Sequence, residues 1–307
     1  MSKRILTILG ATGKQGGSVV NSILGDAAAS SKFSVRAVTR DVTKDSAKAL
    51  AAKGAEVVSA DLDDKNSLRE AFKGAHGVFG RRQAVCPGKN IADACKEENG
   101  QHLVWSSLLN VNKLTNGVLS QVHHFDSKAA VEEYIRELSI PASFFLPGFY
   151  MSNIPGQNLR VGPDGKWQFA MPMPEDAPIP LFAAERDTGK FVKAMFLKRE
   201  EVLGKRVYGA TGYITPLEIL DAFKKVYPAA GKDVAFQRLP NEAFKGILAS
   251  MGLPEPIQEE MLQNMRLVYE FGYYGGEKLD WSKSLVDEPL TTWEEYIKGH
   301  PAFAAAQ

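Results

Sequence analysis

The feature that most constrains this sequence is a glycine-rich segment that directly follows a short apolar run. Residues 5–9 are apolar and lead into Gly10-Ala-Thr-Gly13-Lys-Gln-Gly16-Gly17, after which apolar residues recur at helical spacing up to about residue 24. A strand, a glycine turn and a helix in this order favour dinucleotide binding. Gly10 permits the turn, Gly13 lets the backbone approach a pyrophosphate, and Gly16 lets the helix pack close to the strand. The alternative is a tight turn that holds no ligand.

Strands and helices alternate through the first half of the chain. Apolar runs predict strands over residues 34–39, 55–59, 77–79, 102–105 and 142–146, and helices are expected over 44–53, 66–72, 90–98 and 128–138. This alternation predicts an α/β fold with a Rossmann-type doubly wound parallel sheet, whose ligands bind at the carboxyl ends of the strands.

The second half begins with a proline-containing stretch, residues 148–187, that interrupts the alternation. Beyond it, Asp187 is expected to cap a helix that runs to residue 197, and capping boxes are predicted at Thr215–Glu218 and Thr291–Glu294. Strands are expected near residues 206–208 and 234–237. Met251, Met261 and Met265 fall on apolar helical stripes and are interpreted as core residues.

We therefore expect two regions. Residues 1–153 should form an NAD(P)-binding Rossmann domain, and residues 154–307 a smaller, mostly helical α/β lobe for a substrate or partner, interleaved with the first.

Charge and cysteine content exclude several classes of function. The 307 residues contain 37 Lys+Arg and 36 Asp+Glu, so no basic surface for direct nucleic-acid binding is expected. The two cysteines cannot form a disulfide framework or a zinc cluster, so no metal site is predicted. No apolar run is long enough to span a membrane, which leads us to expect a cytoplasmic protein.

The end of the second predicted strand bears on the choice of dinucleotide. An acidic residue there would accept a hydrogen bond from a ribose 2′-hydroxyl, whereas a cation suits a 2′-phosphate. The strand ends at Thr39-Arg40, and Lys44 follows four residues later, which favours NADP. NAD stays the alternative because Asp41 could simply pair with Arg40 on the surface.

Several motifs along the chain together resemble one known family. They are Gly10-Ala-Thr-Gly-Lys-Gln-Gly-Gly17, Val38-Thr-Arg40, Asp61-Leu-Asp-Asp64, Gly77-Val-Phe-Gly80, Val104-Trp-Ser-Ser107, His124-Phe-Asp-Ser-Lys128 and Leu146-Pro-Gly-Phe-Tyr-Met-Ser-Asn153. The sequence is similar to the NmrA-like family of atypical short-chain dehydrogenase/reductases, whose members bind NAD(P). Founding fungal members of that family repress transcription through a GATA-type factor in response to redox state, and others are described as oxidoreductases.

The resemblance assigns roles to individual residues. It implies that the pyrophosphate is held by Gly10, Ala11, Thr12, Gly13, Lys14, Gln15 and Gly16, and the 2′-phosphate by Arg40 and Lys44. It places Asp61 and Leu62 near the adenine and Phe79 and Gly80 near the ribose. It also places Lys128 on the nicotinamide ribose and Tyr150, Met151, Ser152 and Asn153 beside the nicotinamide.

The expected catalytic motif is incomplete. Ordinary short-chain reductases carry Tyr-x-x-x-Lys, but His124 stands four residues before Lys128. His124 could relay a proton or be ordinary surface polarity, and Tyr150 is a further candidate acid. Ser106 or Ser107 could orient a carbonyl oxygen or merely close a turn.

Two classes of function are consistent with these residues. The first is a redox-sensing regulator that binds the dinucleotide with little or no turnover, for which the resemblance implies a GATA-type transcription factor as partner and the nucleus as a second location. The alternative is an NAD(P)H-dependent oxidoreductase that reduces a small carbonyl or enone. The oligomeric state is left open.

One segment departs from the family pattern. NmrA-like proteins usually carry a longer segment between the Val-Phe-Gly strand end and the next helix, whereas only residues 81–87 intervene here. The shortening could impair cofactor binding or open the pocket. Arg81 and Arg82 in this segment are candidate phosphate contacts.

Overall fold

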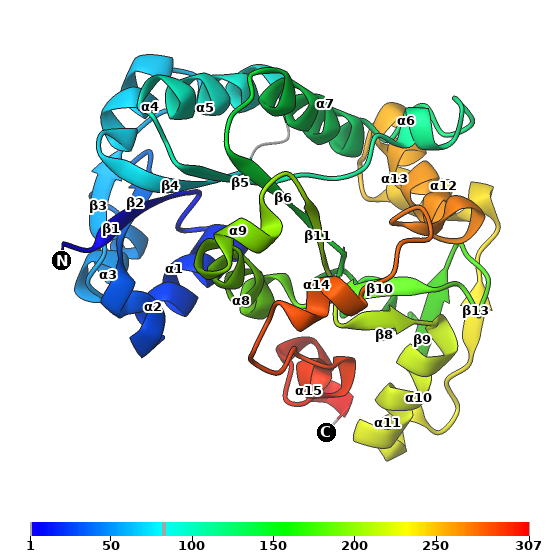
Figure 1. Ribbon diagram of the computed structural model, residues 1–307. Helices are drawn as coiled ribbons and strands as arrows, with labels where there is room; N and C mark the ends of the chain where they lie inside the picture. Colours follow the sequence, from blue (N-terminus) through cyan, green and yellow to red (C-terminus); the bar gives the residue numbers. More distant parts are fainter. Residues whose placement is uncertain (1, 82–83, 307) are drawn as a thin grey trace.

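The computed structural model describes residues 2–81 and 84–306, and a seven-stranded parallel sheet forms its centre (Figure 1). The strand order β3-β2-β1-β4-β5-β6-β11 is that of a Rossmann fold, as predicted. The strands are β1 (Arg4–Leu9), β2 (Phe33–Thr39), β3 (Glu56–Ser59), β4 (Ala75–Gly80), β5 (His102–Ser106), β6 (Ala142–Pro147) and β11 (Arg206–Gly209).

Helices cover both faces of this sheet (Figure 1). One face carries α4 (Lys65–Phe72), α5 (Val85–Glu97), α6 (Val111–Leu114) and α7 (His123–Glu137). The other carries α1 (Lys14–Leu24), α2 (Ala27–Lys32), α3 (Asp45–Ala52), α8 (Ala184–Leu197) and α9 (Arg199–Val202). Each layer has its own buried apolar cluster, so the strands between them are apolar on both sides.

A smaller part of the molecule lies beyond the carboxyl ends of the central strands (Figure 1). Its two three-stranded sheets contain β7 (Phe149–Tyr150), β10 (Ile179–Phe182) and β12 (Gly212–Ile214), and β8 (Leu159–Val161), β9 (Trp167–Met171) and β13 (Phe236–Arg238). Its α-helices are α10 (Pro216–Val226), α11 (Pro228–Gly231), α12 (Asn241–Ser250), α13 (Glu255–Leu267), α14 (Asp280–Ser284) and α15 (Trp293–Ile297). Three single-turn or irregular helices complete it: η1 (Met151–Asn153), η2 (Val268–Gly272) and η3 (Pro301–Ala306).

The two parts of the chain are interleaved. β11 follows residue 153 by more than 50 positions, yet it pairs with β6 at the edge of the central sheet. α8 packs against α1, and a Cβ on Gly189 would lie 2.1 Å from the Ser18 carbonyl oxygen. The backbones therefore approach closely enough to require glycine at this position.

Several expected boundaries were wrong. α5 begins at Val85 rather than at residue 90, and Pro87 is tolerated because the first-turn N–H groups of a helix have no acceptor within it. α7 begins at His123 rather than at residue 128, which puts His124 in the first turn. The proline-containing stretch holds β8, β9 and β10, which the periodicity did not reveal.

Two helix caps also differ from expectation. Asp187 is fully buried inside α8, which begins at Ala184, and its carboxylate accepts hydrogen bonds from the backbone N–H and hydroxyl of Thr291. The last capping box is formed by Thr292 and Glu295, one residue later than predicted, because Thr291 is committed to Asp187. The box at Thr215 and Glu218 is present as predicted.

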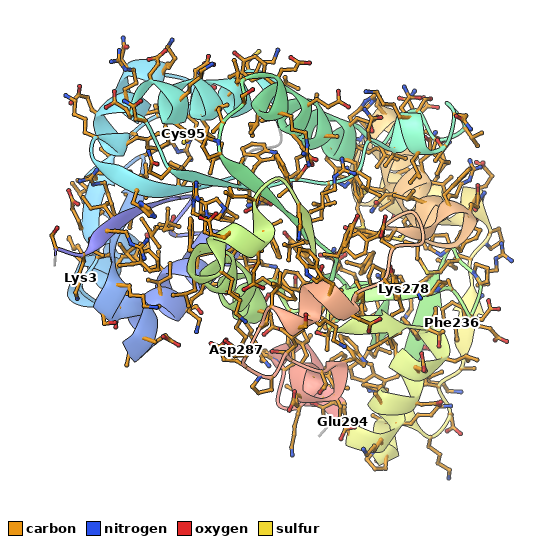
Figure 2. All side chains as sticks on the ribbon, in the orientation of Figure 1. Lys3, Cys95, Phe236, Lys278, Asp287 and Glu294 are labelled. Carbon is orange, nitrogen blue, oxygen red and sulfur yellow. The ribbon has the colours of Figure 1, made fainter. Side chains whose placement is uncertain are left out.

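The two cysteines are free and lie in different environments. Cys95 on α5 is fully buried against the central sheet (Figure 2), and burial raises the pKa of its thiol to about 12. Cys86 is exposed.

Candidate active site

The glycine turn after β1 brings backbone atoms very close together. Gly10 has a φ of +61°, and its carbonyl accepts a hydrogen bond from the Gly13 N–H at 2.9 Å. A Cβ on Gly16 would lie 2.3 Å from the Gly10 oxygen and 2.6 Å from the Gly10 carbonyl carbon. Gly10 therefore makes the turn, and Gly16 allows the start of α1 to pack against it.

The first turn of α1 is open to an anion. Its N-cap is Gly13, which supplies no capping side chain, and no acidic residue occurs in the turn. Unpaired N–H groups at a helix start attract negative charge. The Lys14 ammonium donates to the Ser152 hydroxyl at 2.8 Å, so η1 lies beside this turn. Ala11 is buried and Thr12 is exposed in the same loop.

Two exposed cations follow β2. The side chains of Arg40 and Lys44 form no hydrogen bond or ion pair with any residue in the described part of the chain. The Asp41 carboxylate does not pair with Arg40, because it accepts from the Thr43 N–H at 2.9 Å and from the Thr43 hydroxyl at 2.6 Å. Both side chains are therefore free to meet a ligand at this end of the sheet.

The loop after β3 is held by its own hydrogen bonds. The Asp61 carboxylate accepts from the Asp63 N–H at 3.0 Å, and the Leu62 carbonyl accepts from the Asn90 side chain at 3.1 Å. This fixes the loop beside the ends of β2 and α5.

The end of β4 presents backbone rather than side chains. Phe79 is fully buried in the apolar cluster below the sheet, so its ring cannot reach a ribose. Gly80 packs against Ile91 and Trp105. The next residue, Arg81, lines a cavity, and its Nε is buried without a hydrogen-bond partner among the described residues. Arg82 lies outside the described residues.

Four polar side chains form a hydrogen-bonded chain across the carboxyl ends of β1, β5 and β6. The Lys128 ammonium lies 3.4 Å from the Ser106 hydroxyl, which donates to the Gln15 side-chain oxygen at 3.0 Å. The Gln15 amide nitrogen donates to the Tyr150 hydroxyl at 2.7 Å. The Gln15 side chain is fully buried and connects Ser106 to Tyr150. Ser107 is separate and donates to Glu132 at 2.6 Å.

Burial shifts the pKa of two side chains in this hydrogen-bonded series. Lys128 is 4% exposed, and burial, with a smaller contribution from the nearby Arg81 charge, lowers its pKa to about 7. Burial also raises the pKa of Tyr150, so its phenol keeps its proton at neutral pH. The Tyr150 oxygen accepts the bond from Gln15, which leaves its own proton available to a ligand.

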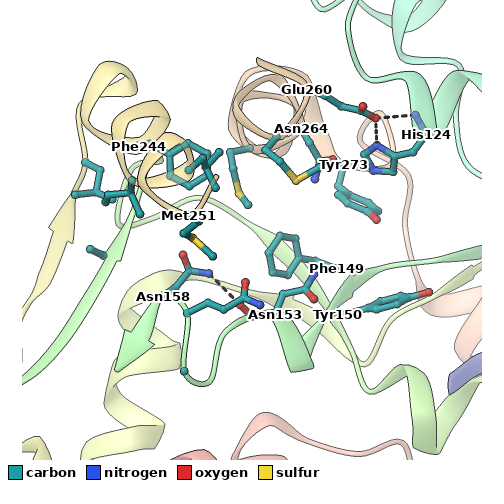
Figure 3. A pocket seen from close by; sticks show the side chains of 18 of the residues that line it. His124, Phe149, Tyr150, Asn153, Asn158, Phe244, Met251, Glu260, Asn264 and Tyr273 are labelled. Atoms are coloured by element: carbon teal, nitrogen blue, oxygen red, sulfur yellow. Dashed lines mark hydrogen bonds and ion pairs between the residues drawn. The ribbon is translucent and has the colours of Figure 1, made fainter. Parts of the chain in front are cut away.

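His124 forms a contact with the C-terminal part of the chain. Its Nδ1 lies 2.5 Å from Glu260 Oε1, and the same oxygen accepts from the His124 backbone N–H at 2.9 Å (Figure 3). Burial lowers the pKa of His124, and the Glu260 carboxylate opposes this effect. Because Nδ1 must carry the proton that it shares with the carboxylate, the neutral ring leaves Nε2 as an acceptor. His123 is exposed and contacts Gln121 at 3.1 Å.

A cavity of about 680 Å³ joins these groups to the smaller part of the molecule. Lys128, His124, Tyr150, Asn153 and Arg81 contribute to its wall. Figure 3 shows Phe244, Met251 and Asn264 facing Phe149 and Asn158 across it. The structure thus brings together the three predicted catalytic candidates; Met151 is fully buried and is not in this wall.

Sequence reasoning missed most of the cavity. Glu260 and Asn264 on α13 and the glutamines Gln157, Gln168 and Gln237 line it, but no local motif marks them. The interpretation as a core residue is confirmed for Met265, which is buried, and Met261 packs against the same core, but it was wrong for Met251, which is 65% exposed; all three also line the cavity.

Two further features are absent from the part of the chain that the structure describes. It contains no group of three or more His, Cys, Asp or Glu side chains arranged to hold a metal ion. None of its helices is long and apolar enough to cross a membrane.

Comparison with known proteins gives a consistent result. The model of the NmrA-like family matches residues 1–297. An NmrA-like family domain-containing oxidoreductase of Aspergillus campestris is 31% identical over 99% of this chain and 91% of its own length. One from Malbranchea aurantiaca is 34% identical over 77% of this chain and 76% of its own length.

Solved structures show the same fold. NmrA, a negative transcriptional regulator, in complex with NAD superposes with a TM-score of 0.80 at 22% identity, covering 100% of this chain and 99% of that one. The NADPH-dependent quinone oxidoreductase QOR2 of Escherichia coli, complexed with NADPH, gives 0.76 at 22% identity, with 96% and 99% coverage. With a family match over nearly its whole length, this chain belongs to the NmrA-like family.

Proposed function

We propose that this protein is an NADP(H)-dependent oxidoreductase that reduces a carbonyl or enone. The observation that carries this proposal is the 680 Å³ cavity, because Lys128, Tyr150 and His124 line it together next to the glycine turn. A protein that only senses a dinucleotide needs no chamber beside these groups. Relatives at 31% and 34% identity are named oxidoreductases, which supports the same class.

The residues present fit a dinucleotide. Gly13 leaves the start of α1 uncovered for a pyrophosphate, and the Gly16 contact shows that the turn has the required close packing. Arg40 and Lys44 are unpaired cations at the end of β2, which suits the 2′-phosphate of NADP. NAD is the alternative ligand, and the NmrA structure with NAD is consistent with it.

The chain's own side chains supply the proton chemistry. Bound NADPH would supply a hydride to the substrate carbon, and the substrate oxygen then needs a proton. Tyr150 is the best donor, because burial keeps its phenol protonated and its proton has no acceptor among the described residues. Lys128, with a pKa of about 7, would hold the ribose, and its hydrogen-bonded connection through Ser106 and Gln15 would orient the Tyr150 hydroxyl.

His124 is the weaker acid candidate. Its pKa is lowered by burial, and its Nδ1 proton is directed to Glu260, so the neutral ring has no proton to give to the cavity. It stands where other short-chain reductases carry tyrosine, but its role here is to join α7 to α13.

The test is a reductase assay that follows loss of NADPH with a panel of quinones, aldehydes and enones. Tyr150→Phe should lower kcat by about 100-fold or more while NADPH affinity holds, since general acid catalysis contributes about this much. His124→Asn should lower it far less. Equal rates for wild type and Tyr150→Phe, or a large loss only in His124→Asn, would contradict the assignment.

A second function is favoured by one observation. His124 replaces the usual tyrosine, which is consistent with a redox-sensing regulator that binds the dinucleotide with little or no turnover. Such a protein would present its surface to a transcription factor of GATA type and act in the nucleus as well as the cytoplasm. NmrA, which shares the fold, is titled a negative transcriptional regulator.

Calorimetry separates these two functions. Titration with NADP⁺, NADPH, NAD⁺ and NADH should show tight NADPH binding for a reductase and preference for the oxidised forms for a sensor. Arg40→Ala should weaken the binding of NADP⁺ much more than the binding of NAD⁺. Equal losses of affinity for the two dinucleotides would contradict a role of Arg40 in binding the 2′-phosphate.

A further inference from the structure

The part of the cavity farthest from the glycine turn has a different chemistry from the part that holds Lys128 and Tyr150. Its wall comes from α12, α13 and the segment between them, and it contains Phe244, Leu248, Met251, Met261 and Met265 (Figure 3). Apolar and sulfur-containing side chains of this kind adapt to ring systems of different shape. We call this part the distal chamber.

The exposed Arg160 of β8 lines the cavity. The helical wall of the distal chamber, by contrast, offers no charge to a ligand. None of its wall residues named above is ionisable, and Glu260 at its edge is committed to His124. A charged group placed there would lose its hydration without gaining a partner. The occupant must therefore be uncharged where it faces α12 and α13.

One polar atom in the wall lacks a partner. The side-chain oxygen of Asn264 is buried and has no hydrogen bond within the described residues. Asn264 follows Glu260 by four positions, so both side chains lie on the helix face that lines the cavity. A buried acceptor without a donor is costly, and a ligand N–H or O–H would remove that cost.

We propose that the distal chamber binds the body of the substrate, a bulky ring system that is uncharged where it faces α12 and α13 and that donates one hydrogen bond to Asn264. This inference rests on the proposed reductase function, since it names the class of its substrate. It replaces the small carbonyl expected from the sequence with a larger molecule, because the cavity of about 680 Å³ contains the distal chamber in addition to the space beside Lys128 and Tyr150 that the dinucleotide would share.

Met251 provides an independent readout. It follows the end of α12, lines the cavity and is 65% exposed. A ligand that fills the distal chamber would cover it. Oxidation of Met251 by dilute peroxide, measured by mass spectrometry, should therefore slow when the chamber is occupied.

The experiment uses N-phenyl-1-naphthylamine, an uncharged fluorescent ring compound with one N–H donor, and its N-methyl analogue, which has none. Both are titrated into the full chain saturated with NADP⁺, whose own binding is measured separately by calorimetry. Asn264→Leu should lower the affinity for the N–H probe by about 5- to 10-fold, as expected for the loss of one hydrogen bond, and leave the affinity for the N-methyl probe unchanged. Asn241→Leu, the same change at an exposed position of α12 outside the cavity wall, should alter neither affinity.

The outcomes separate the two proposals. Binding of NADP⁺ without binding of either probe, equal losses for both probes in Asn264→Leu, or undiminished Met251 oxidation would overturn the substrate class and leave the reductase function standing. Failure of NADP⁺ to bind would instead contradict the proposed function. Asn264→Leu removes an unpaired buried oxygen, so the variant is expected to fold, and its melting temperature checks this.

Discussion

A buried lysine at the centre of a site works against the stability of the empty protein. Lys128 loses its proton near pH 7 when folded, compared with 10.5 as the ordinary value, because burial penalises the ammonium. The unfolded chain therefore binds more protons between these two pH values, and stability rises with pH across that window.

Lys128→Met should consequently stabilise the protein without dinucleotide. The gain should be about 2 to 4 kcal/mol at pH 7 or below, shrink as the pH rises, and vanish near pH 10.5. Urea unfolding at pH 7 and pH 10 measures it, with the exposed Lys232→Met as the control that should change little. A gain of equal size at both pH values would show that the ammonium is not penalised by burial.

Gly16 is constrained by backbone atoms that cannot move aside. A Cβ there would lie 2.3 Å from the Gly10 oxygen and 2.8 Å from the Leu9 oxygen, so Gly16→Ala should cost about 1 to 3 kcal/mol and weaken dinucleotide binding. Gly246 in α12 has no atom within 4 Å of such a Cβ, and Gly246→Ala should instead stabilise its helix slightly. Thermal unfolding of both variants tests the difference; a tolerated alanine at position 16 would refute the close packing.

At the scale of elements, the contact between α7 and α13 closes the cavity. His124 and Glu260 are 136 positions apart, and the carboxylate accepts two hydrogen bonds from one residue. The pKa of His124 is lowered from 6.5 because burial outweighs the carboxylate. His124 is the stronger base in the unfolded chain, where its pKa is about 6.5. The free energy of unfolding therefore decreases as the pH falls from 6.5 to below the lower pKa of the folded protein.

Glu260→Gln should lower the pKa of His124 further, because the amide keeps a hydrogen-bond acceptor but removes the charge that favours the imidazolium. NMR titration of the His124 ring proton in wild type and variant measures this. A higher pKa in the variant would mean that Glu260 does not act on His124 as the structure shows.

Elements differ in how well local sequence predicts them. The glycine turn, β1 and α1 were predicted because Gly10, Gly13 and Gly16 report backbone geometry at their own positions. β10 was missed because Pro180 lies within it, opposite Tyr213, and proline argues against a strand. Glu260 and Asn264 could not be found, since an acid or amide on a helix acquires its role only from what packs opposite.

At the scale of the whole molecule, the Rossmann sheet depends on residues after position 153. β11 pairs along β6, and α8 covers the face of α1 that contains Ser18 and Ser22. The Gly189 N–H also donates to the Ser18 hydroxyl at 2.9 Å. A division at residue 153 therefore marks a change in sequence pattern, whereas the packing of the core continues across it.

The fragment 1–153 should accordingly fail to fold by itself. Without α8 and β11 it exposes one face of α1 and leaves β6 as an unpaired edge, which favours aggregation. Co-expression with 154–307 should restore a soluble complex that binds NADP⁺, because the missing helix and strand return in trans. Circular dichroism melts and calorimetry on fragment, complex and full chain provide the measurement. A fragment that unfolds cooperatively and binds NADP⁺ with the affinity of the full chain would show instead that residues 1–153 are an independent domain, and α8 would then be an accessory layer rather than part of the core.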